Sequence, residues 1–223
     1  MYLEQNIKGL CQKFGLSYQE FLSDFQIDNV KELSVFDLET ITEEYQLDVQ
    51  ALLFKPLYDK TAFREQLQKI KLLVLDVDGV MTDGGAYMTM NGDQMKKFDT
   101  KDGRGIIEIQ KKGVTVAIIS SGFYDVGVSA RAKMLGIENC YVGKRPKLEV
   151  LDEMCQKMNI TRNEVAMIGD DINDLEMMRV IGFKACPSNA VPLVKNEVNI
   201  ILQKKGGDGC VREFIDEYLM GFE

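Results

Sequence analysis

Short apolar runs alternate with helical patterns along the chain from about residue 69 onward. Five such runs predict buried strands, at residues 71–75, 114–119, 164–168, 183–186 and 199–202. Between them, apolar residues recur at helical spacing near residues 105–112, 126–135, 147–158 and 172–181. Nearly continuous apolar strands separated by helices are typical of a parallel sheet covered on both faces. The sequence therefore predicts an α/β domain over residues 69–223, built on a Rossmann-like doubly wound parallel sheet.

Residues 84–98 carry a different pattern, in which alternating residues flank an Asn91-Gly92 turn. Asn-Gly in that setting is typical of a two-stranded hairpin, so we expect a β-hairpin flap here. The segment between Asp78 and Gly113 has room for this hairpin but not for a large cap domain.

The first 58 residues form a separate segment with its own pattern. Apolar residues recur at helical spacing over residues 3–14 and 38–45, and Asp48 can cap a further helical turn. Pro56 and a polar stretch follow, so we expect a small all-α module at residues 1–58 and a linker at residues 59–68. Residues 14–22 and 45–53 resemble the two halves of phage-repressor helix-turn-helix domains. The module nevertheless holds ten acidic and four basic residues, a net charge of −6, which favours protein contact or oligomerisation over DNA binding.

The composition excludes several classes of protein. Of the 223 residues, 45% are hydrophobic and 28% are charged, which permits a packed core and argues against wholesale disorder. The net charge of −8 disfavours nucleic acid and anionic membranes as partners. The chain has no histidine, which excludes Ser-His-Asp and Cys-His catalysis and any His-ligated metal site. Acid–base chemistry must then fall to carboxylates, Lys, Tyr or Cys.

Cysteine usage indicates a reducing compartment. The five cysteines are scattered and include no C-x-x-C pair: Cys11, Cys140, Cys155, Cys186 and Cys210. Their odd number and wide spacing predict reduced thiols, mostly in the core. No apolar run approaches about 18 residues, and the first 20 residues lack a signal-peptide pattern. We therefore expect a cytoplasmic protein with no membrane association.

Carboxylates follow the first predicted strand of the sheet. In such a sheet, ligands bind beyond the carboxyl ends of the strands. Asp76 and Asp78 are two residues apart at that point, and both can reach one site. Two close carboxylates repel each other unless a cation lies between them, and Mg²⁺ suits oxygen ligands beside a phosphate. A polar turn after the strand is the alternative explanation.

Phosphate-binding candidates follow in later segments. Ser120-Ser121-Gly122 offers hydroxyl and backbone N–H groups at the end of the second long strand, although Ser-Ser-Gly also occurs in ordinary loops. Lys147 precedes a helix and could neutralise both a nucleophile and a phosphate, unless it belongs to a solvated basic turn.

Three more carboxylates lie close together in Gly169-Asp170-Asp171-Ile172-Asn173-Asp174. Burying them unpaired would be costly, and a metal shared with the first strand removes that cost. A helix N-cap by Asp171 or Asn173 is the structural alternative.

The order of these motifs resembles the haloacid dehalogenase superfamily of aspartate-nucleophile phosphotransferases. Within it, four segments are similar to the small capless phosphatases that act on 3-deoxy-D-manno-octulosonate 8-phosphate or on nonulosonate 9-phosphates. These segments are residues 76–84, 98–106, 135–137 and 206–213. The resemblance covers about residues 69–223, and residues 1–68 lie outside it.

The resemblance implies roles for individual residues. Asp76 is expected to be the nucleophile and Asp78 the general acid and base, while Mg²⁺ is held by Asp76, the backbone carbonyl of Asp78 and Asp170. Ser120 and Lys147 are expected to hold the phosphoryl oxygens, with Ser121 as the alternative to Ser120. Three further residues are expected to support this site: Asp171, Asp174 and Gly122.

The resemblance also bears on the substrate and the assembly. Relatives without a cap close the site by forming a homotetramer, which makes Lys101, Asp102 and Arg212 candidates for substrate contacts. Position 123 departs from the family, because Phe123 stands where a charged residue is common. The substrate is then a phosphorylated sugar acid of either lipopolysaccharide or sialic acid biosynthesis: 3-deoxy-D-manno-octulosonate 8-phosphate or an acylneuraminate-type 9-phosphate. Two other functions stay open: a sugar-phosphate phosphotransferase or phosphomutase, and a regulatory protein recruited through the N-terminal module.

Overall fold

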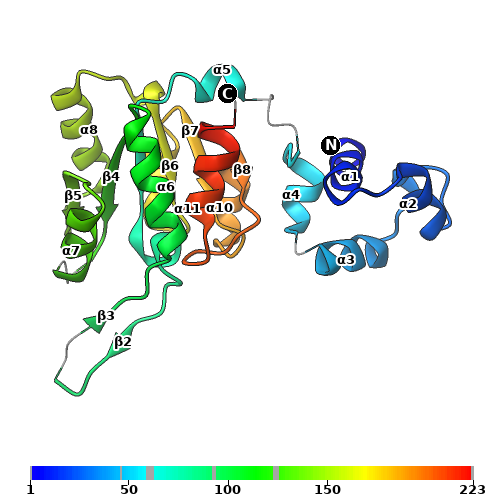
Figure 1. Cartoon of the computed structure of the whole chain (residues 1–223), viewed down its shortest axis with the longest axis horizontal. Coiled ribbons are helices and arrows are strands. Elements are labelled where there is room, and N and C mark those ends of the chain that lie inside the picture. Colours follow the sequence, from blue (N-terminus) through cyan, green and yellow to red (C-terminus); the bar gives the residue numbers. More distant parts are fainter. Residues whose placement is uncertain (1, 46, 59–62, 92–93, 123–125, 222–223) are drawn as a thin grey trace. The chain divides into compact units, whose positions relative to one another are not determined.

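The computed structural model divides the chain into two compact units, residues 1–63 and residues 64–223 (Figure 1). It describes residues 2–45, 47–58, 63–91, 94–122 and 126–221. The division falls inside the segment predicted as a linker, because Arg64–Leu67 forms a short helix, α5, that belongs to the second unit.

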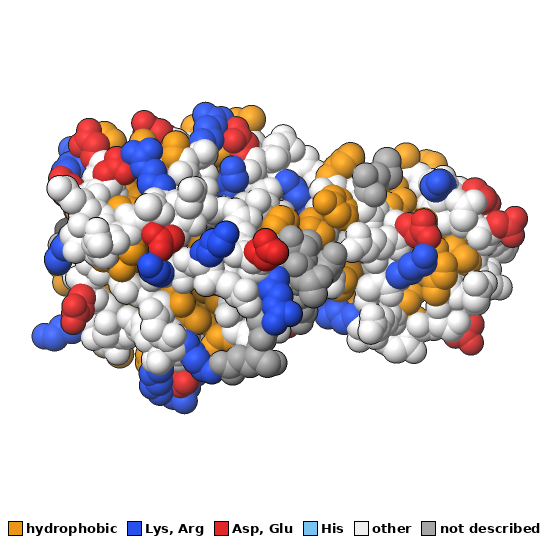
Figure 2. Space-filling model, turned by 90° about the horizontal axis from the view of Figure 1, so that it is seen from above, with side chains coloured by type: hydrophobic (Ala, Val, Ile, Leu, Met, Phe, Trp, Pro, Cys, Tyr) orange, Lys and Arg blue, Asp and Glu red, His pale blue; other side chains and the backbone are white. Residues whose placement is uncertain are grey.

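The first unit is helical, as predicted. Its elements are α1 (Leu3–Phe14), α2 (Tyr18–Asp24), the 3₁₀ turn η1 (Val30–Glu32), α3 (Val35–Glu44) and α4 (Val49–Phe54). The helices α2, α3 and α4 begin at the caps Ser17, Ser34 and Asp48, whose side chains accept backbone N–H bonds. Hydrophobic side chains also reach the surface of this unit, seen on the right in Figure 2.

A buried asparagine joins α1 to α4 in this unit. The Asn6 side chain is fully buried and donates to the carbonyls of Leu52 and Lys55, at 2.8 and 2.7 Å. Its own oxygen accepts the N–H of Leu57 at 3.0 Å. Asn6 therefore satisfies the carbonyl groups that the end of α4 leaves without helical partners. The sequence pattern gave no sign of this role, because a polar residue in an amphipathic helix ordinarily faces water.

The second unit contains a six-stranded parallel sheet, which confirms the predicted doubly wound α/β class. The strands lie in the order β5-β4-β1-β6-β7-β8, so β1 is inside the sheet and later strands lie on both of its sides. The strands are β1 (Leu72–Leu75), β4 (Thr115–Ser120), β5 (Asn139–Val142), β6 (Val165–Ile168), β7 (Phe183–Cys186) and β8 (Ile200–Ile201). The central strands β1 and β6 are buried along their whole length, as expected when helices cover both faces.

Helices flank this sheet, and their bounds agree with most of the predicted segments. They are α6 (Thr100–Lys111), α7 (Val126–Met134), α8 (Lys147–Met158), α9 (Leu175–Met178), α10 (Pro192–Glu197) and α11 (Cys210–Phe214). Helices α6 and α11 pack side by side in front of the sheet in Figure 1. Shorter turns complete the unit: η2 (Val77–Met81), η3 (Arg162–Glu164), η4 (Ile172–Asp174) and η5 (Ile215–Leu219).

Strand β5 and helices α10 and α11 are among the elements that were not predicted. Strand β5 lies at the sheet edge, and its half-buried residues Asn139 to Val142 lack the apolar run that marks a central strand. Helices α10 and α11 are short, and their apolar residues are too few to show a period.

The predicted hairpin is present. Strands β2 (Tyr87–Met88) and β3 (Gln94–Met95) pair antiparallel, and a bridge between Thr82 and Phe98 closes the base (Figure 1). Gly92 of the predicted Asn91-Gly92 turn lies outside the described residues.

The cysteines lie mostly in the core, as predicted. All five lie outside any disulfide in the structure, and four of them are buried. Among the described residues, no helix combines the length and the apolar character needed to cross a membrane. The cytoplasmic location stays a prediction.

Candidate active site

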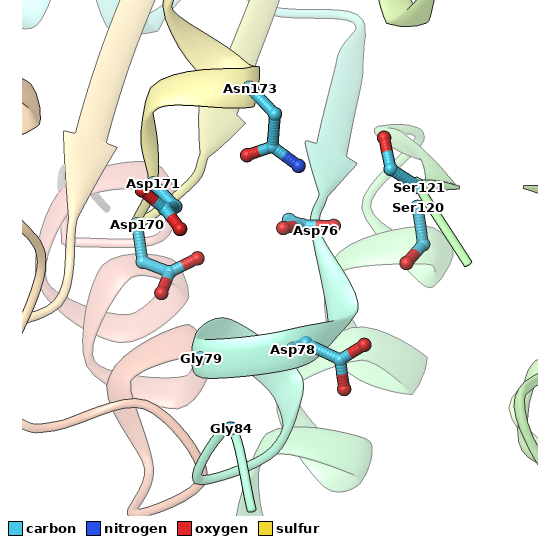
Figure 3. A pocket seen from close by; sticks show the side chains of 9 residues that line it. All are labelled: Asp76, Asp78, Gly79, Gly84, Ser120, Ser121, Asp170, Asp171 and Asn173. Atoms are coloured by element: carbon cyan, nitrogen blue, oxygen red, sulfur yellow. The ribbon is translucent and has the colours of Figure 1, made fainter. Parts of the chain in front are cut away.

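A polar cavity of about 210 Å³ lies beyond the carboxyl ends of β1, β4 and β6 (Figure 3). The residues that line it come from three segments separated in sequence: Asp76, Asp78, Gly79, Gly84, Ser120, Ser121, Asp170, Asp171 and Asn173. The parallel sheet brings these segments together, because β1 pairs with β4 on one side and with β6 on the other. The predicted carboxylates and serines that follow these strands therefore converge at one edge of the sheet.

A lysine lies between two buried carboxylates at the floor of the site. The Nζ atom of Lys147, in the first turn of α8, is 2.9 Å from Oδ1 of Asp76 and 2.6 Å from Oδ1 of Asp174. All three side chains are almost fully buried. Burial disfavours the lysine charge, but the carboxylates of Asp76 and Asp174 more than offset burial and raise the pKa of Lys147. The alternative of a solvated basic turn is therefore wrong for Lys147.

Three carboxylates near Lys147 lie close enough together to bind a cation. One oxygen from each of Asp76, Asp170 and Asp174 lies within 4.8 Å of the others. Burial, and then the charge of Asp174, raises the pKa of Asp76 to about 6 despite Lys147. Burial, followed by the charges of Asp76 and Asp174, raises the pKa of Asp170 to about 7.

A metal ion fits this arrangement of carboxylates. Oδ1 of Asp170 is buried and has no hydrogen-bond partner in the described part of the chain. An unpaired buried carboxylate oxygen beside a second carboxylate is stabilised by a bound divalent ion, and the all-oxygen ligand set suits Mg²⁺. The structure thus brings together the side chains of Asp76 and Asp170, with Asp174, expected to support the site, beside them.

Asp174 supports the other groups. Its Oδ1 pairs with Lys147, and its Oδ2 accepts the N–H of Asp170 at 3.0 Å. Asp171 lies at the rim, where its side chain caps η4 by accepting the N–H of Ile172 at 2.7 Å. The sequence left capping and site formation as alternatives for this segment, and in the structure Asp171 both caps η4 and lines the cavity.

Two glycines let the backbone approach the carboxylates closely. Gly79 has φ +83°, and a Cβ there would collide with the carboxylate of Asp170. Gly206, in the C-terminal Gly-Gly-Asp-Gly segment, packs its Cα against the carbonyl of Gly79 so tightly that a Cβ would collide with it. The N–H of Gly207 also donates to the carbonyl of Val80 at 2.9 Å. The C-terminal segment thus buttresses the loop that carries Asp76 and Asp78.

Asp78 and the serines form the outer side of the site. Ser120 is buried at the end of β4, whereas Ser121 is exposed, and both line the cavity. The Asp78 carboxylate forms an ion pair with Lys96, which follows β3 of the hairpin. Sequence analysis did not find Lys96, because a lysine in a polar hairpin is not distinguishable from a solvated one without the fold.

The three substrate candidates do not line the cavity among the described residues. Asp102 is 2% exposed, and its Oδ1 accepts the backbone N–H of Arg212 at 2.7 Å. The Nε atom of Arg212 pairs with Asp216 at 2.6 Å, and Lys101 is exposed at the start of α6. Asp102 and the backbone of Arg212 therefore join α6 to α11, and a role in substrate contact stays a prediction.

The remaining predicted residues lie near the rim. Gly122 lines an adjoining pocket together with Ser120 and Ser121. Phe123, on which the choice of substrate depends, lies outside the described residues.

Known proteins with similar sequences belong to a family of hydrolases. The sequence model of the haloacid dehalogenase-like hydrolases matches residues 102–182. The 3-deoxy-D-manno-octulosonate 8-phosphate phosphatase KdsC of Escherichia coli (strain K12) is 36% identical over 153 residues, which span 69% of this chain and 81% of that protein.

Solved structures show the same similarity. The 3-deoxy-D-manno-octulosonate 8-phosphate phosphatase of Moraxella catarrhalis, crystallised with a magnesium ion, a phosphate ion and KDO, has a TM-score of 0.67 and 31% identity. The match covers 72% of this chain and 95% of that one. The cobalt-bound deoxy-D-mannose-octulosonate 8-phosphate phosphatase of Haemophilus influenzae has a TM-score of 0.66 and 33% identity, with 70% and 90% of the two chains covered.

Proposed function

The chain belongs to the haloacid dehalogenase-like hydrolases, as a KdsC-like phosphatase and phosphoric monoester hydrolase, and from this premise we propose that it hydrolyses a phosphorylated keto-sugar acid with Mg²⁺. The observation that carries the proposal is the convergence of Asp76 and Asp170 in one cavity, with the buried ammonium of Lys147 paired to Asp76. A nucleophile, a cation site and a fixed ammonium lie there within reach of a single phosphoryl group.

Asp76, Asp170 and the backbone carbonyl of Asp78 are the groups that would hold Mg²⁺. Bound there, the ion supplies positive charge that offsets the carboxylates and the phosphoryl oxygens. Lys147 adds a second positive charge on the far side of Asp76. Its burial between Asp76 and Asp174 holds the ammonium in place before substrate arrives, which favours electrostatic stabilisation of a charged transition state.

In our proposal, Asp76 acts as the nucleophile and Asp78 as the general acid and base. A carboxylate oxygen of Asp76 forms a bond to phosphorus as the bond to the sugar oxygen breaks, giving an aspartyl phosphate. Asp78 donates a proton to the departing sugar oxygen and then takes one from the water that hydrolyses the aspartyl phosphate. Water supplies the oxygen of the released phosphate, and Asp76 is regenerated.

We propose that Ser120 and the backbone N–H groups of Ser121 and Gly122 bind phosphoryl oxygens. Ser120 is buried at the end of β4 and lines the cavity beside Asp76 and Asp78, whereas Ser121 is exposed. A buried hydroxyl loses less conformational freedom on binding than an exposed one, which supports Ser120 over Ser121.

The substrate is proposed from the relatives. Their names give 3-deoxy-D-manno-octulosonate 8-phosphate, and this phosphate ester is our first candidate. An acylneuraminate-type 9-phosphate is the second, because Phe123 leaves the usual charged position without a charge.

A homotetramer is part of the same proposal. Four large apolar side chains on the hairpin are exposed in the single chain: Tyr87, Met88, Met90 and Met95. Exposed apolar side chains gathered on one flap mark a protein contact surface.

A role for the first unit is proposed separately. Val35 and Phe36 at the start of α3 are 77% and 78% exposed, and the surrounding module is acidic. We propose that residues 1–58 bind another protein rather than DNA. The absence of a gel shift at low salt, together with a partner captured by the full chain but not by a Phe36→Ser variant, would support this.

Replacing the nucleophile tests the proposed function. With Mg²⁺ present, the wild-type protein should release phosphate from 3-deoxy-D-manno-octulosonate 8-phosphate, and Asp76→Asn should not. Asp24→Asn, at an exposed position of α2, is the matched control and should keep full activity. Turnover by Asp76→Asn at the wild-type rate would refute the assignment. Phosphate found on an added acceptor sugar instead of in solution would favour a phosphotransferase.

A further inference from the structure

A second polar pocket of about 190 Å³ adjoins the cavity that holds Asp76. The two share Asp78, Ser120 and Ser121, so they are continuous on the side where the leaving group must lie. The rest of its described lining comes from the hairpin, the loop after β4, α7 and β5: Gln94, Lys96, Gly122, Val128 and Val142. Its mixture of hydrogen-bond donors with two valines suits a hydroxylated carbon chain.

Lys96 is fixed in this pocket by the fold of the hairpin. Side chains alternate along an extended segment, so Gln94, Lys96 and Phe98 lie on one side, and all three are at least half-buried. Met95 and Lys97 lie on the other side and are exposed. The β3 pairing before Lys96 and the Thr82–Phe98 bridge after it hold its backbone in place.

The ammonium of Lys96 has an unusual position for a hairpin lysine. Its side chain is 12% exposed, and it forms an ion pair with Asp78. Among the described residues that line the two pockets, Lys96 is the single cation. Phe123, which follows Gly122, adds no positive charge.

The negative charge of the cavity explains why Lys96 matters for binding the leaving group. The cavity carries Asp76, Asp78, Asp170 and Asp171, so a carboxylate on the substrate would be repelled unless a cation faces it. Lys147 is buried under Asp76 and already pairs with two carboxylates. An ammonium has three N–H donors, so Lys96 can donate to a substrate carboxylate from its position beside Asp78, and that carboxylate becomes its anionic partner when Asp78 carries the proton for the leaving group.

We propose that Lys96 is a specificity-determining residue, whose ammonium binds the carboxylate of the sugar acid in the pocket beside Asp78. The inference rests on the proposed function, which it deepens by naming the group that separates an acidic substrate from a neutral sugar phosphate. Val128 and Val142 pack against the carbon chain, and Gln94 donates to its hydroxyl groups.

The test compares two substrates in the full-length protein. One is 3-deoxy-D-manno-octulosonate 8-phosphate, and the other is D-arabinose 5-phosphate, which has the phosphate on a primary hydroxyl but no carboxylate. In Lys96→Met, the ratio of kcat/KM for the acidic over the neutral substrate should fall by about 10- to 100-fold, mainly through KM. Lys96→Arg should restore most of this ratio, since it retains the charge. Lys97→Met, on the opposite side of the hairpin, should keep the wild-type ratio.

The outcomes separate this inference from the proposed function. An unchanged ratio in Lys96→Met, with the acidic substrate still hydrolysed by the wild type, would overturn the role of Lys96 alone. An equal loss on both substrates, through kcat, would also overturn it, because Lys96 would then serve only Asp78. A wild-type protein that hydrolyses neither substrate would refute the proposed function, and this inference with it.

Discussion

At the scale of single residues, the site depends on carboxylates that the fold forces together. Asp76, Asp170 and Asp174 lie within 4.8 Å of one another, and Lys147 pairs with two of them. Burial and mutual repulsion raise the pKa values of Asp76 and Asp170, and a bound cation would offset both effects. Buried carboxylates with raised pKa values are typical of a site that binds a metal and an anionic substrate, rather than of a stabilising salt bridge.

Gly79 is the residue at which this arrangement is most sensitive. It combines φ +83° with a Cβ direction that points into the Asp170 carboxylate. We expect Gly79→Ala to displace Asp170 or the loop and to lower Mg²⁺-dependent phosphate release by about 100-fold. Phosphate release and thermal unfolding would be measured on the same preparation.

Gly113 provides the matched control for that substitution. It also has positive φ, +92°, but nothing lies within 4 Å of a Cβ placed there. Gly113→Ala should lose about 1–2 kcal/mol of stability from backbone strain and keep its activity. Equal activities in the two variants would show that the close approach to Asp170 does not matter.

At the scale of elements, the contact between α6 and α11 explains why two distant motifs occur together. Gly105 of α6 faces Arg212 so closely that a Cβ there would lie 2.9 Å from the arginine Cδ. Asp102 receives the Arg212 N–H, and Glu213 accepts the N–H groups of Gln203 and Lys204 at 2.9 and 2.8 Å. The Asp-Gly-x-Gly-Ile segment and the C-terminal segment are therefore two halves of one packing contact.

Asp102 offers a test of this structural role through pH. Burial raises its pKa to about 7, so the folded protein retains the proton that the unfolded chain loses near pH 4. The stability of the wild type should therefore fall between about pH 4 and pH 7, and the penalty is complete above pH 7. Asp102→Asn keeps the acceptor for Arg212 and removes the charge.

We expect Asp102→Asn to melt roughly 5 °C above the wild type at pH 8 and close to it at pH 4. Thermal unfolding followed by circular dichroism at both pH values measures the difference. A variant that melts alike at both pH values but binds substrate poorly would instead support the predicted substrate contact.

At the scale of the whole molecule, the chain divides into two compact units, and we expect them to have separate tasks. The sheet unit contains every residue assigned to catalysis, and the first unit contributes none of the described cavity lining. A chain of residues 64–223 should therefore fold and release phosphate with Mg²⁺. Light scattering of both lengths would show whether the hairpin suffices for the proposed tetramer; loss of activity on removing the first unit would contradict the division of tasks.

The sequence alone determined the class of fold, the succession of most strands and helices along the chain, and the residue types at the strand ends. Apolar periods are local, so they record strands and helices directly, and the carboxylates after β1 and β6 and the serine after β4 needed only the rule that parallel strands end at one edge. Even the capping residues of α2, α3 and α4 are of the types that local chemistry favours.

Contacts across long stretches of chain were decided by the tertiary structure alone. The pairing of Lys96 with Asp78, the approach of Gly206 to Gly79, and the burial of Asn6 and Asp102 all join segments whose distance in space no local pattern encodes. A polar side chain has the same local sequence pattern whether it faces water or a buried partner. Only packing determines which of these applies, because packing sets the solvation and the neighbouring charges of each group.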